Sequence, residues 1–187
     1  TTGTAVSYTV AQALTGISVS IPAGTTAANM PFFTITPKDD AIYEKSEDFG
    51  MTISNPTNAT IGTNSATGTI LDEDNGDTTD GSTTDGDKPT VTVGNASIVE
   101  GGNLEHNVTV NGVTETAVTY PFSLTSGSTN PATAGSDYTN APTFSDGVTY
   151  DSGAGTITVP AGVTSFKVTY PTTADTILEN DETTTLT

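Results

Sequence analysis

Apolar and polar side chains alternate with a period of two in short runs along the chain. The alternation is strict at residues 17–21 (Ile-Ser-Val-Ser-Ile) and recurs at 91–93, 108–110, 118–120 and 157–159. Successive side chains of a β-strand point to opposite faces of the sheet, so this period predicts strands with one buried face. Gly, Pro, Asn and Asp interrupt the runs at roughly ten-residue spacing, which is typical of an antiparallel sandwich or barrel. The sequence therefore predicts an all-β fold.

Helical periodicity is weak throughout. The best candidate is the Ala-rich stretch at 10–14, which is short and is followed at once by Thr15 and Gly16, so we expect no helix there. Aromatic residues fall inside the strand-like runs, and six of them are expected in the core: Tyr8, Tyr120, Phe122, Phe144, Phe166 and Tyr170.

One passage occurs twice. Ile-Pro-Ala-Gly at 21–24 and Val-Pro-Ala-Gly at 159–162 each lead through a Thr-rich strand to an acidic loop. The spacing of Glu44 and Glu179 gives a period of about 135 residues, and a fixed period indicates tandem structural units. The acids of the two loops are Asp39, Asp40, Glu44 and Glu47 in the first passage and Asp175, Glu179 and Glu182 in the second.

The repeat and a low-complexity segment together predict the domain organisation. Residues 75–88 read as an acidic linker, because they contain no apolar residue, repeat Asp-Gly and carry like charges that extend a chain. Residues 1–74 are then the C-terminal part of one repeat, and 89–187 are a second repeat that lacks its last strand. The counterpart of that strand in the first unit is residues 66–71.

The two units carry complementary defects, because each holds strands that the other is missing. Unpaired strand edges are templates for pairing with another chain. We therefore expect head-to-tail self-association, in which residues 54–71 of one molecule complete the sandwich formed by residues 89–187 of another. In a longer parent protein the same pairing would occur within one repeat.

Charge narrows the classes of partner. The chain has 22 acidic residues against 4 lysines, no arginine, and a formal net charge of -18. Nucleic-acid binding depends on a cationic surface, which this chain cannot supply, and an anionic membrane surface would repel it. No apolar run approaches the length of a membrane span, so no direct membrane insertion is expected. The absence of cysteine excludes disulfides, so a bound metal is the usual alternative for stabilising a small extracellular domain.

The sequence gives little support for an enzyme, and we expect no catalysis. The single His106 lies in an expected strand, where a surface position is favoured over a catalytic one. Paired carboxylates can hydrolyse glycosides, but the chain has no Trp to build a sugar platform. The run at 72–77 superficially resembles an EF-hand loop, yet Gly76 is one position early and Thr83 occupies the place of the bidentate Glu.

Four strings together resemble the Calx-beta repeat family. Residues 54–61 (Ser-Asn-Pro-Thr-Asn-Ala-Thr-Ile) and 66–74 (Ala-Thr-Gly-Thr-Ile-Leu-Asp-Glu-Asp) resemble the end of that repeat. Residues 98–102 (Ile-Val-Glu-Gly-Gly) resemble its opening, and 134–139 (Ala-Gly-Ser-Asp-Tyr-Thr) its middle. The match covers nearly the whole chain apart from the linker. It implies an immunoglobulin-like antiparallel β-sandwich, with calcium bound at one end.

The resemblance also assigns Ca2+ ligands by position. In the first unit these are Asp39, Asp40, Glu44 and Glu47 of the loop, with Asp72, Glu73 and Asp74 of a terminal acidic run; in the second unit they are Glu100, Asp137, Asp175, Glu179 and Glu182. Ala174 departs from the pattern, because it replaces the first of the paired loop acids, and each site is incomplete within this chain. Clustered carboxylates suit calcium, which takes oxygen ligands. The alternative is that these acids are solvated surface charges.

The Thr-rich, cysteine-free character is most similar to the tandem copies in RTX-type, calcium-dependent bacterial adhesins of biofilms. The expected function is thus a calcium-stabilised extracellular spacer at the bacterial cell surface, which projects a distal ligand-binding domain and has neighbouring repeats of the same chain as its partners. The alternative is a glycan- or protein-binding module of a surface protein. A third reading, the calcium sensor of an exchanger, would require membrane spans on either side.

Overall fold

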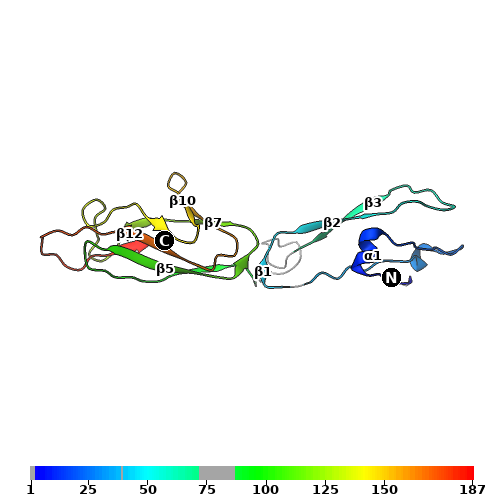
Figure 1. Cartoon of the computed structure of the whole chain (residues 1–187), viewed down its shortest axis with the longest axis horizontal. Coiled ribbons are helices and arrows are strands. Elements are labelled where there is room, and N and C mark those ends of the chain that lie inside the picture. Colours follow the sequence, from blue (N-terminus) through cyan, green and yellow to red (C-terminus); the bar gives the residue numbers. More distant parts are fainter. Residues whose placement is uncertain (1–2, 39, 72–86) are drawn as a thin grey trace. The chain divides into compact units, whose positions relative to one another are not determined.

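A computed structural model describes residues 3–38, 40–71 and 87–187 (Figure 1). The chain divides into two compact units, Thr1–Asp39 and Asp40–Thr187. Most of the expected linker, together with Asp39, Asp72, Glu73 and Asp74, lies outside the described residues.

The first unit contains one short helix, contrary to expectation. Helix α1 (Val10–Thr15) is followed by a 3-10 turn, η1 (Ala27–Asn29). A capping box begins α1: the Gln12 backbone N–H donates to the Thr9 hydroxyl at 3.3 Å, and the Thr9 backbone N–H donates to the Gln12 side-chain oxygen at 2.8 Å. These two bonds satisfy amides at the helix start that a short helix would otherwise leave exposed.

The prediction of a strand at residues 17–21, made from strict alternation, is wrong, because no strand forms there. Ile21 is 54% exposed, and no described residue of this unit is buried. A strand needs a hydrogen-bonded neighbour, which the period of the sequence cannot supply by itself. Tyr8 is likewise outside the core; its ring meets Phe33 edge to face at 5.8 Å, and its hydroxyl donates to the Thr34 carbonyl at 2.8 Å.

The second unit is built from strands. Their bounds are β1 (Ile42–Tyr43), β2 (Glu47–Thr52), β3 (Ser65–Ile70), β4 (Thr90–Val93), β5 (Asn103–Asn111), β6 (Val113–Thr114), β7 (Val118–Pro121), β8 (Leu124–Ser126), β9 (Thr143–Phe144), β10 (Thr149–Asp151), β11 (Thr156–Val159), β12 (Ser165–Pro171) and β13 (Thr184–Leu186). The prediction of an all-β fold with antiparallel sheets is confirmed.

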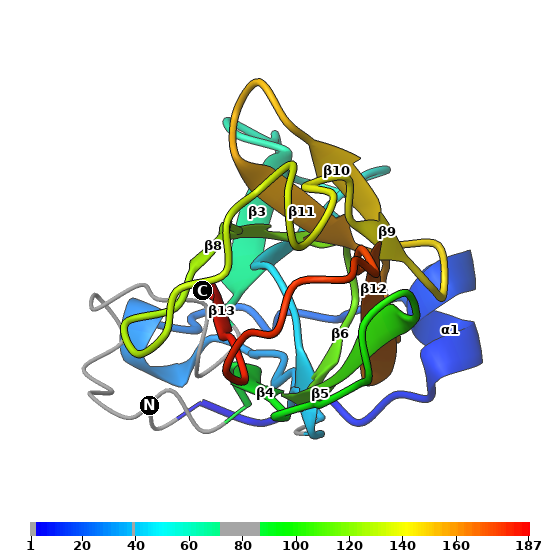
Figure 2. The same ribbon diagram turned by 90° about the vertical axis from the view of Figure 1, so that its left-hand side faces the viewer.

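Two layers of strands surround the core. One sheet has the order β4-β5-β12-β9, and the other side is formed by β10-β11-β7 and by β13-β8. Strands β7 and β8 follow one another along the chain. Between them, the Phe122 backbone N–H donates to the carbonyl of Gly155, the residue just before β11. Strands β8 and β13 lie across from β9 and β12 (Figure 2). The remaining pairs are the antiparallel hairpin β2-β3 and the parallel pair β1-β6, in which Ile42 faces Val113.

Buried side chains alternate along the central strands, as a half-buried sheet requires. In β5 the buried residues are His106, Val108 and Val110, and in β12 they are Phe166, Val168 and Tyr170. Phe166 lies opposite Val108, and Val168 lies opposite His106. Phe122, Leu124, Ile157 and Val159 from the other layer complete the same cluster, against which Tyr120 and Phe144 pack. Five of the six aromatic residues expected in the core are therefore there or against it.

His106 is buried, which corrects the expectation of a surface position. Its Nδ1 lies 2.9 Å from the Gly94 carbonyl and its Nε2 lies 3.1 Å from the Tyr170 hydroxyl, which in turn lies 2.6 Å from the Thr184 hydroxyl. A carbonyl only accepts, so Nδ1 carries a proton, and in the neutral imidazole Nε2 then accepts from the Tyr170 hydroxyl. This chain of hydrogen bonds links β5 and β12 to β13 through the core.

Candidate metal centre

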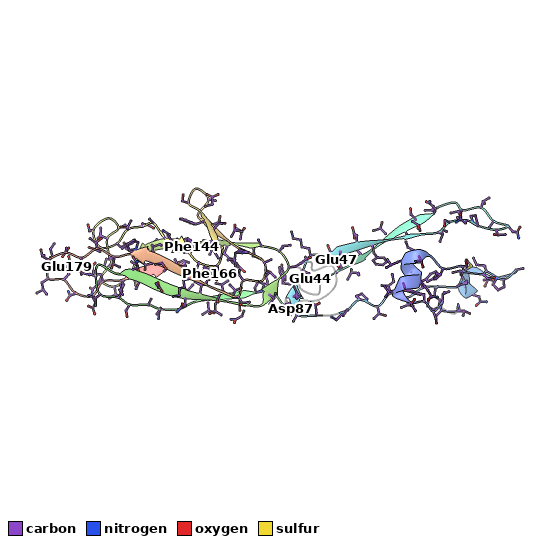
Figure 3. The ribbon with its side chains drawn as sticks, viewed as in Figure 1. Glu44, Glu47, Asp87, Phe144, Phe166 and Glu179 are labelled. Carbon is purple, nitrogen blue, oxygen red and sulfur yellow. The ribbon has the colours of Figure 1, made fainter. Side chains whose placement is uncertain are left out.

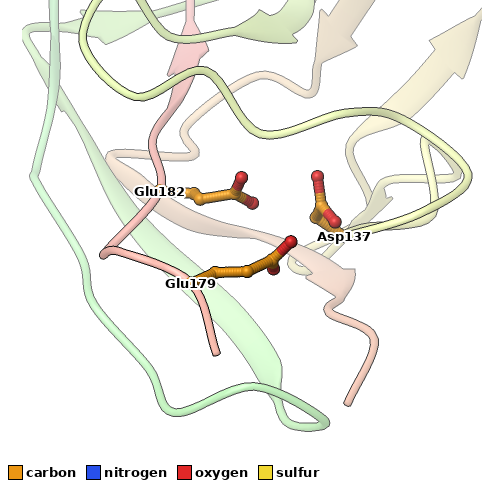
Figure 4. Close-up of side chains that lie close together, drawn as sticks. All are labelled: Asp137, Glu179 and Glu182. Atoms are coloured by element: carbon orange, nitrogen blue, oxygen red, sulfur yellow. The ribbon is translucent and has the colours of Figure 1, made fainter. Parts of the chain in front are cut away.

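Three carboxylates converge at one end of the second unit. One oxygen each from Asp137, Glu179 and Glu182 lies within 4.8 Å of the other two. Figure 4 shows the three side chains pointing toward one another from two loops, one carrying Asp137 and the other carrying Glu179 and Glu182. Asp137 is half-buried, whereas the two glutamates are exposed. Among the described residues this is the group of acids whose geometry can hold a metal ion.

Asp137 is held by the loop between β8 and β9. Its Oδ2 accepts from the Thr133 backbone N–H at 2.5 Å, and its carbonyl accepts from the Thr173 backbone N–H at 2.8 Å. The tight turn uses Gly135, whose φ of 90° favours glycine. The next residue, Tyr138, is 2% exposed and packs edge to face on Tyr170. Burial of Tyr138 therefore fixes the acid beside it.

Glu182 and Glu179 lie on the loop that enters β13. Asn130 holds this loop, because its carbonyl accepts from the Thr183 backbone N–H at 2.8 Å and its side-chain amide donates to the Asp181 carbonyl at 3.2 Å. The segment from Thr183 onward is paired into the sheet, so Glu182 is anchored directly. Glu179 depends on the loop itself.

The two repeated passages form the same local turn at their aligned aspartates. Asp175 Oδ1 accepts from the Ile177 backbone N–H at 2.7 Å, and Asp40 Oδ1 accepts from the Ile42 backbone N–H at 3.2 Å. An aspartate that bonds its own backbone two residues on forms an Asx turn. The two passages therefore share this turn at their aligned aspartates.

Without a bound cation, the ionised carboxylates of the cluster repel one another. Desolvation, followed by the charges of Asp175, Asp137 and Glu100, raises the pKa of Glu179. Desolvation, the hydrogen bond to Asp137 and the charges of Asp137, Glu179 and Glu100 raise the pKa of Glu182. Both shifts report carboxylates that would gain from a proton or a cation.

All five acids expected as ligands in the second repeat (residues 89–187) therefore belong to one region. Asp137, Glu179 and Glu182 form the cluster, and Glu100 and Asp175 lie close enough for their charges to affect Glu179. Sequence reasoning missed the residues that position the acids, namely Thr133 and Asn130. Thr133 acts through its backbone, and nothing in the sequence distinguishes Asn130 from other loop asparagines.

The acids expected as ligands in the first repeat (residues 1–74) are not part of this group. Asp40 is exposed and forms its Asx turn, Glu44 is half-buried and follows β1, and Glu47 is exposed at the start of β2 (Figure 3). The other four ligands expected in the first repeat lie outside the described residues; they are Asp39, Asp72, Glu73 and Asp74. The metal site predicted for that repeat stays a prediction.

No family model, curated protein or solved structure matches this chain. Within the described residues, no helix is long and apolar enough to cross a membrane.

Proposed function

We propose that this chain consists of Calx-beta-like, immunoglobulin-like repeats from the spacer region of a large bacterial surface adhesin, and that calcium stabilises them. The observation that carries the proposal is the convergence of Asp137, Glu179 and Glu182. The resemblance singles out these three acids as ligands from two distant strings, and they meet at one end of the unit. The antiparallel sheet pairing is what such a repeat requires.

The spacing of the three carboxylates is compatible with calcium. Ligand oxygens bind calcium at about 2.3–2.6 Å, so two oxygens on one ion are at most about 5 Å apart. The observed limit of 4.8 Å fits inside that span. The ligands are all carboxylates, which favours hard cations over zinc.

Calcium in this cluster would act mechanically. It neutralises the acids and ties the β8–β9 loop, which carries Asp137, to the β12–β13 loop, which carries Glu179 and Glu182. Fixing both loops stiffens the end of the repeat where the chain passes to its neighbour. A stiff array of such units holds a distal binding domain away from the cell, which is the role of an extracellular spacer. Extracellular modules bind calcium at about 10⁻⁴–10⁻³ M, which suits such a partly exposed site.

Calcium-dependent unfolding tests this function. A ligand that binds only the folded state at a hundredfold excess over Kd adds about 2.7 kcal/mol to the free energy of unfolding. Thermal unfolding of the full chain in about 10–100 mM calcium, a hundredfold excess over the Kd expected for such a site, should therefore occur many degrees higher than in chelator. Coincident unfolding curves would refute the proposal.

A matched pair of variants locates the effect. Glu182→Gln removes one charge from the cluster and should abolish most of the calcium shift. Asp151→Asn also removes one charge, but this residue forms a separate turn, in which its Oδ1 accepts from the Gly153 backbone N–H at 2.9 Å. Asparagine keeps that acceptor oxygen, so the control should respond to calcium like the parent chain. Equal losses in both variants would place the calcium site elsewhere.

A further inference from the structure

An apolar groove opens between the two layers of the sandwich. It has a volume of about 250 Å³, and its lining includes Val91, Val93, Val108, Phe122, Phe166 and Leu186. Val91 and Val93 belong to the edge strand β4 and are 40% and 42% exposed, although they line the same space as buried core residues. Leu186 lies on β13, an edge strand of the other layer. The groove therefore joins the core to two strand edges.

The hydrogen bonds between β13 and β8 determine which residues of β13 direct their backbone groups toward the free edge of the strand. Ser123 and Thr187 exchange both backbone bonds, at 2.8 and 3.0 Å, and Gly127 donates to the Thr183 carbonyl at 2.7 Å. In an antiparallel ladder every second residue bonds to a given neighbour. The residues between, Thr184 and Leu186, therefore direct their backbone groups away from β8. No described strand pairs with that edge.

The chain contains a template for the strand that fits this edge. By the internal repeat, β2 is the counterpart of β13, with Glu47 equivalent to Glu182. Strand β2 pairs with β3, placing Phe49 opposite Gly68 and Met51 opposite Ala66. The bond from the Ile53 backbone N–H to the Asn64 carbonyl, at 2.8 Å, sets the phase so that Phe49 and Met51 bond to β3.

The two phases agree. Phe49 and Met51 are the repeat counterparts of Thr184 and Leu186, whose backbone groups face the free edge. A strand with the register of β3 can therefore pair with β13 without any shift. One face of β3 presents Ala66, which would lie opposite Leu186 beside the groove. The match includes hydrogen-bond phase, strand direction and side-chain face.

The present partner of β3 gives it little stability. Strands β2 and β3 form a two-stranded hairpin in which no residue is buried. An isolated two-stranded hairpin is at best marginally stable in water. On transfer from β2 to the shorter strand β13, β3 re-forms its backbone hydrogen bonds opposite Thr184 and Leu186. It also covers apolar surface at the groove, and this burial is the favourable term that drives the transfer.

We propose that β3 of one copy of this chain pairs with β13 of a second copy, with Gly68 opposite Thr184 and Ala66 opposite Leu186, and covers the apolar groove. Because donor strand and acceptor edge are different surfaces of one molecule, the contact is head to tail and can extend to further copies. This association is independent of the proposed calcium role, since its contacts are backbone groups and apolar side chains.

Disulfide trapping between two full-length variants tests the register. The pair Gly50 and Thr67 in the hairpin corresponds to Thr185 and Thr67 in the complex. This is a non-hydrogen-bonded pair, with Cα atoms about 4.5 Å apart, which a disulfide can bridge. The chain has no cysteine of its own. A Thr67→Cys copy mixed with a size-tagged Thr185→Cys copy in a thiol redox buffer should give the mixed disulfide.

A shifted pair is the control. Thr69→Cys mixed with Thr185→Cys places the thiols on the same face but diagonally, with Cα atoms about 7–8 Å apart, and should give a several-fold lower yield. A peptide of residues 64–71 should suppress the Thr67–Thr185 product, whereas the same peptide with Gly68→Pro, which lacks a ladder donor, should not. Equal yields for the two cysteine pairs, or a monomer at every concentration by light scattering, would overturn the proposal.

All of these measurements are made in chelator and again in millimolar calcium. The mixed disulfide should form in both. Trapping without a calcium-dependent unfolding shift would overturn the proposed function alone, and a calcium shift without trapping would overturn strand transfer alone.

Discussion

Removal of the Tyr170 hydroxyl should destabilise the second unit substantially. Tyr170 is fully buried at 0% exposure, and its hydroxyl bonds to His106 Nε2 at 3.1 Å and to Thr184 Oγ1 at 2.6 Å. Tyr170→Phe deletes both bonds while keeping the ring in place. Each hydrogen bond contributes about 0.5–1.5 kcal/mol net, and a buried polar group left without a partner costs about 1–3 kcal/mol.

We therefore expect Tyr170→Phe to lower the free energy of unfolding by about 2–4 kcal/mol. A loss of this size is a large part of the roughly 5–15 kcal/mol that stabilises an ordinary domain. Urea unfolding followed by tyrosine fluorescence and by circular dichroism measures it directly. Because Thr184 is two residues from Glu182, the calcium midpoint should also rise in the variant.

Tyr120→Phe is the matched control. The Tyr120 hydroxyl oxygen is also buried, but it has no hydrogen-bond partner among the described residues. Its removal relieves a desolvated group instead of breaking a bond, so the variant should be as stable as the parent or more stable by about 1 kcal/mol. Equal destabilisation by the two variants would refute the assignment of the His106–Tyr170–Thr184 chain as a stabilising network.

Three further outcomes follow from the cluster and the core. In chelator, Glu182→Gln should raise the unfolding temperature, because it removes one of the like charges that raise the pKa of Glu179 and Glu182; a fall would contradict the repulsion. Those pKa values are higher in the folded state than in the unfolded state, so the folded chain binds more protons. In chelator, the contribution of the cluster to stability should therefore decline as the pH rises from the ordinary glutamate pKa through the raised values. Melts at several pH values check this, and calcium should cancel the decline at neutral pH. Val168→Ala, at a site 1% exposed, should cost about 2–3 kcal/mol by urea unfolding.

The sequence predicts the sandwich where alternating residues find partners. In β5 and β12 the period of two places Val108 opposite Phe166, and both are buried. At residues 17–21 the same period is stricter, yet no strand forms. Periodicity reports which face a strand would bury and says nothing about whether a neighbour is available. The capping box at Thr9 and Gln12 was a local signal for α1 that apolar periodicity alone did not reveal.

The candidate site was predictable in composition and less so in geometry. Repeat matching and the family resemblance singled out Asp137, Glu179 and Glu182, which the structure brings together. Their convergence depends on loop conformations fixed by backbone bonds from Thr133 and Thr183, which side-chain patterns do not encode. His106 shows the same limit in the core, since its burial depends on two partners, Gly94 and Tyr170, that are distant from it in sequence.

The contact between Phe49 and Gly68 bears on how repeats of this kind can diverge. A Cβ added at Gly68 would lie 2.4 Å from the Phe49 ring, so within the hairpin a larger residue opposite that ring would require the ring to move. Strand β13 has Thr184 in the place of Phe49, and the smaller residue leaves room for a side chain at the facing position. The edge of β13 is therefore the more permissive of the two equivalent edges. Strands whose sequences have drifted beyond what β2 accepts could still be accommodated there, which would let unequal repeats recognise one another.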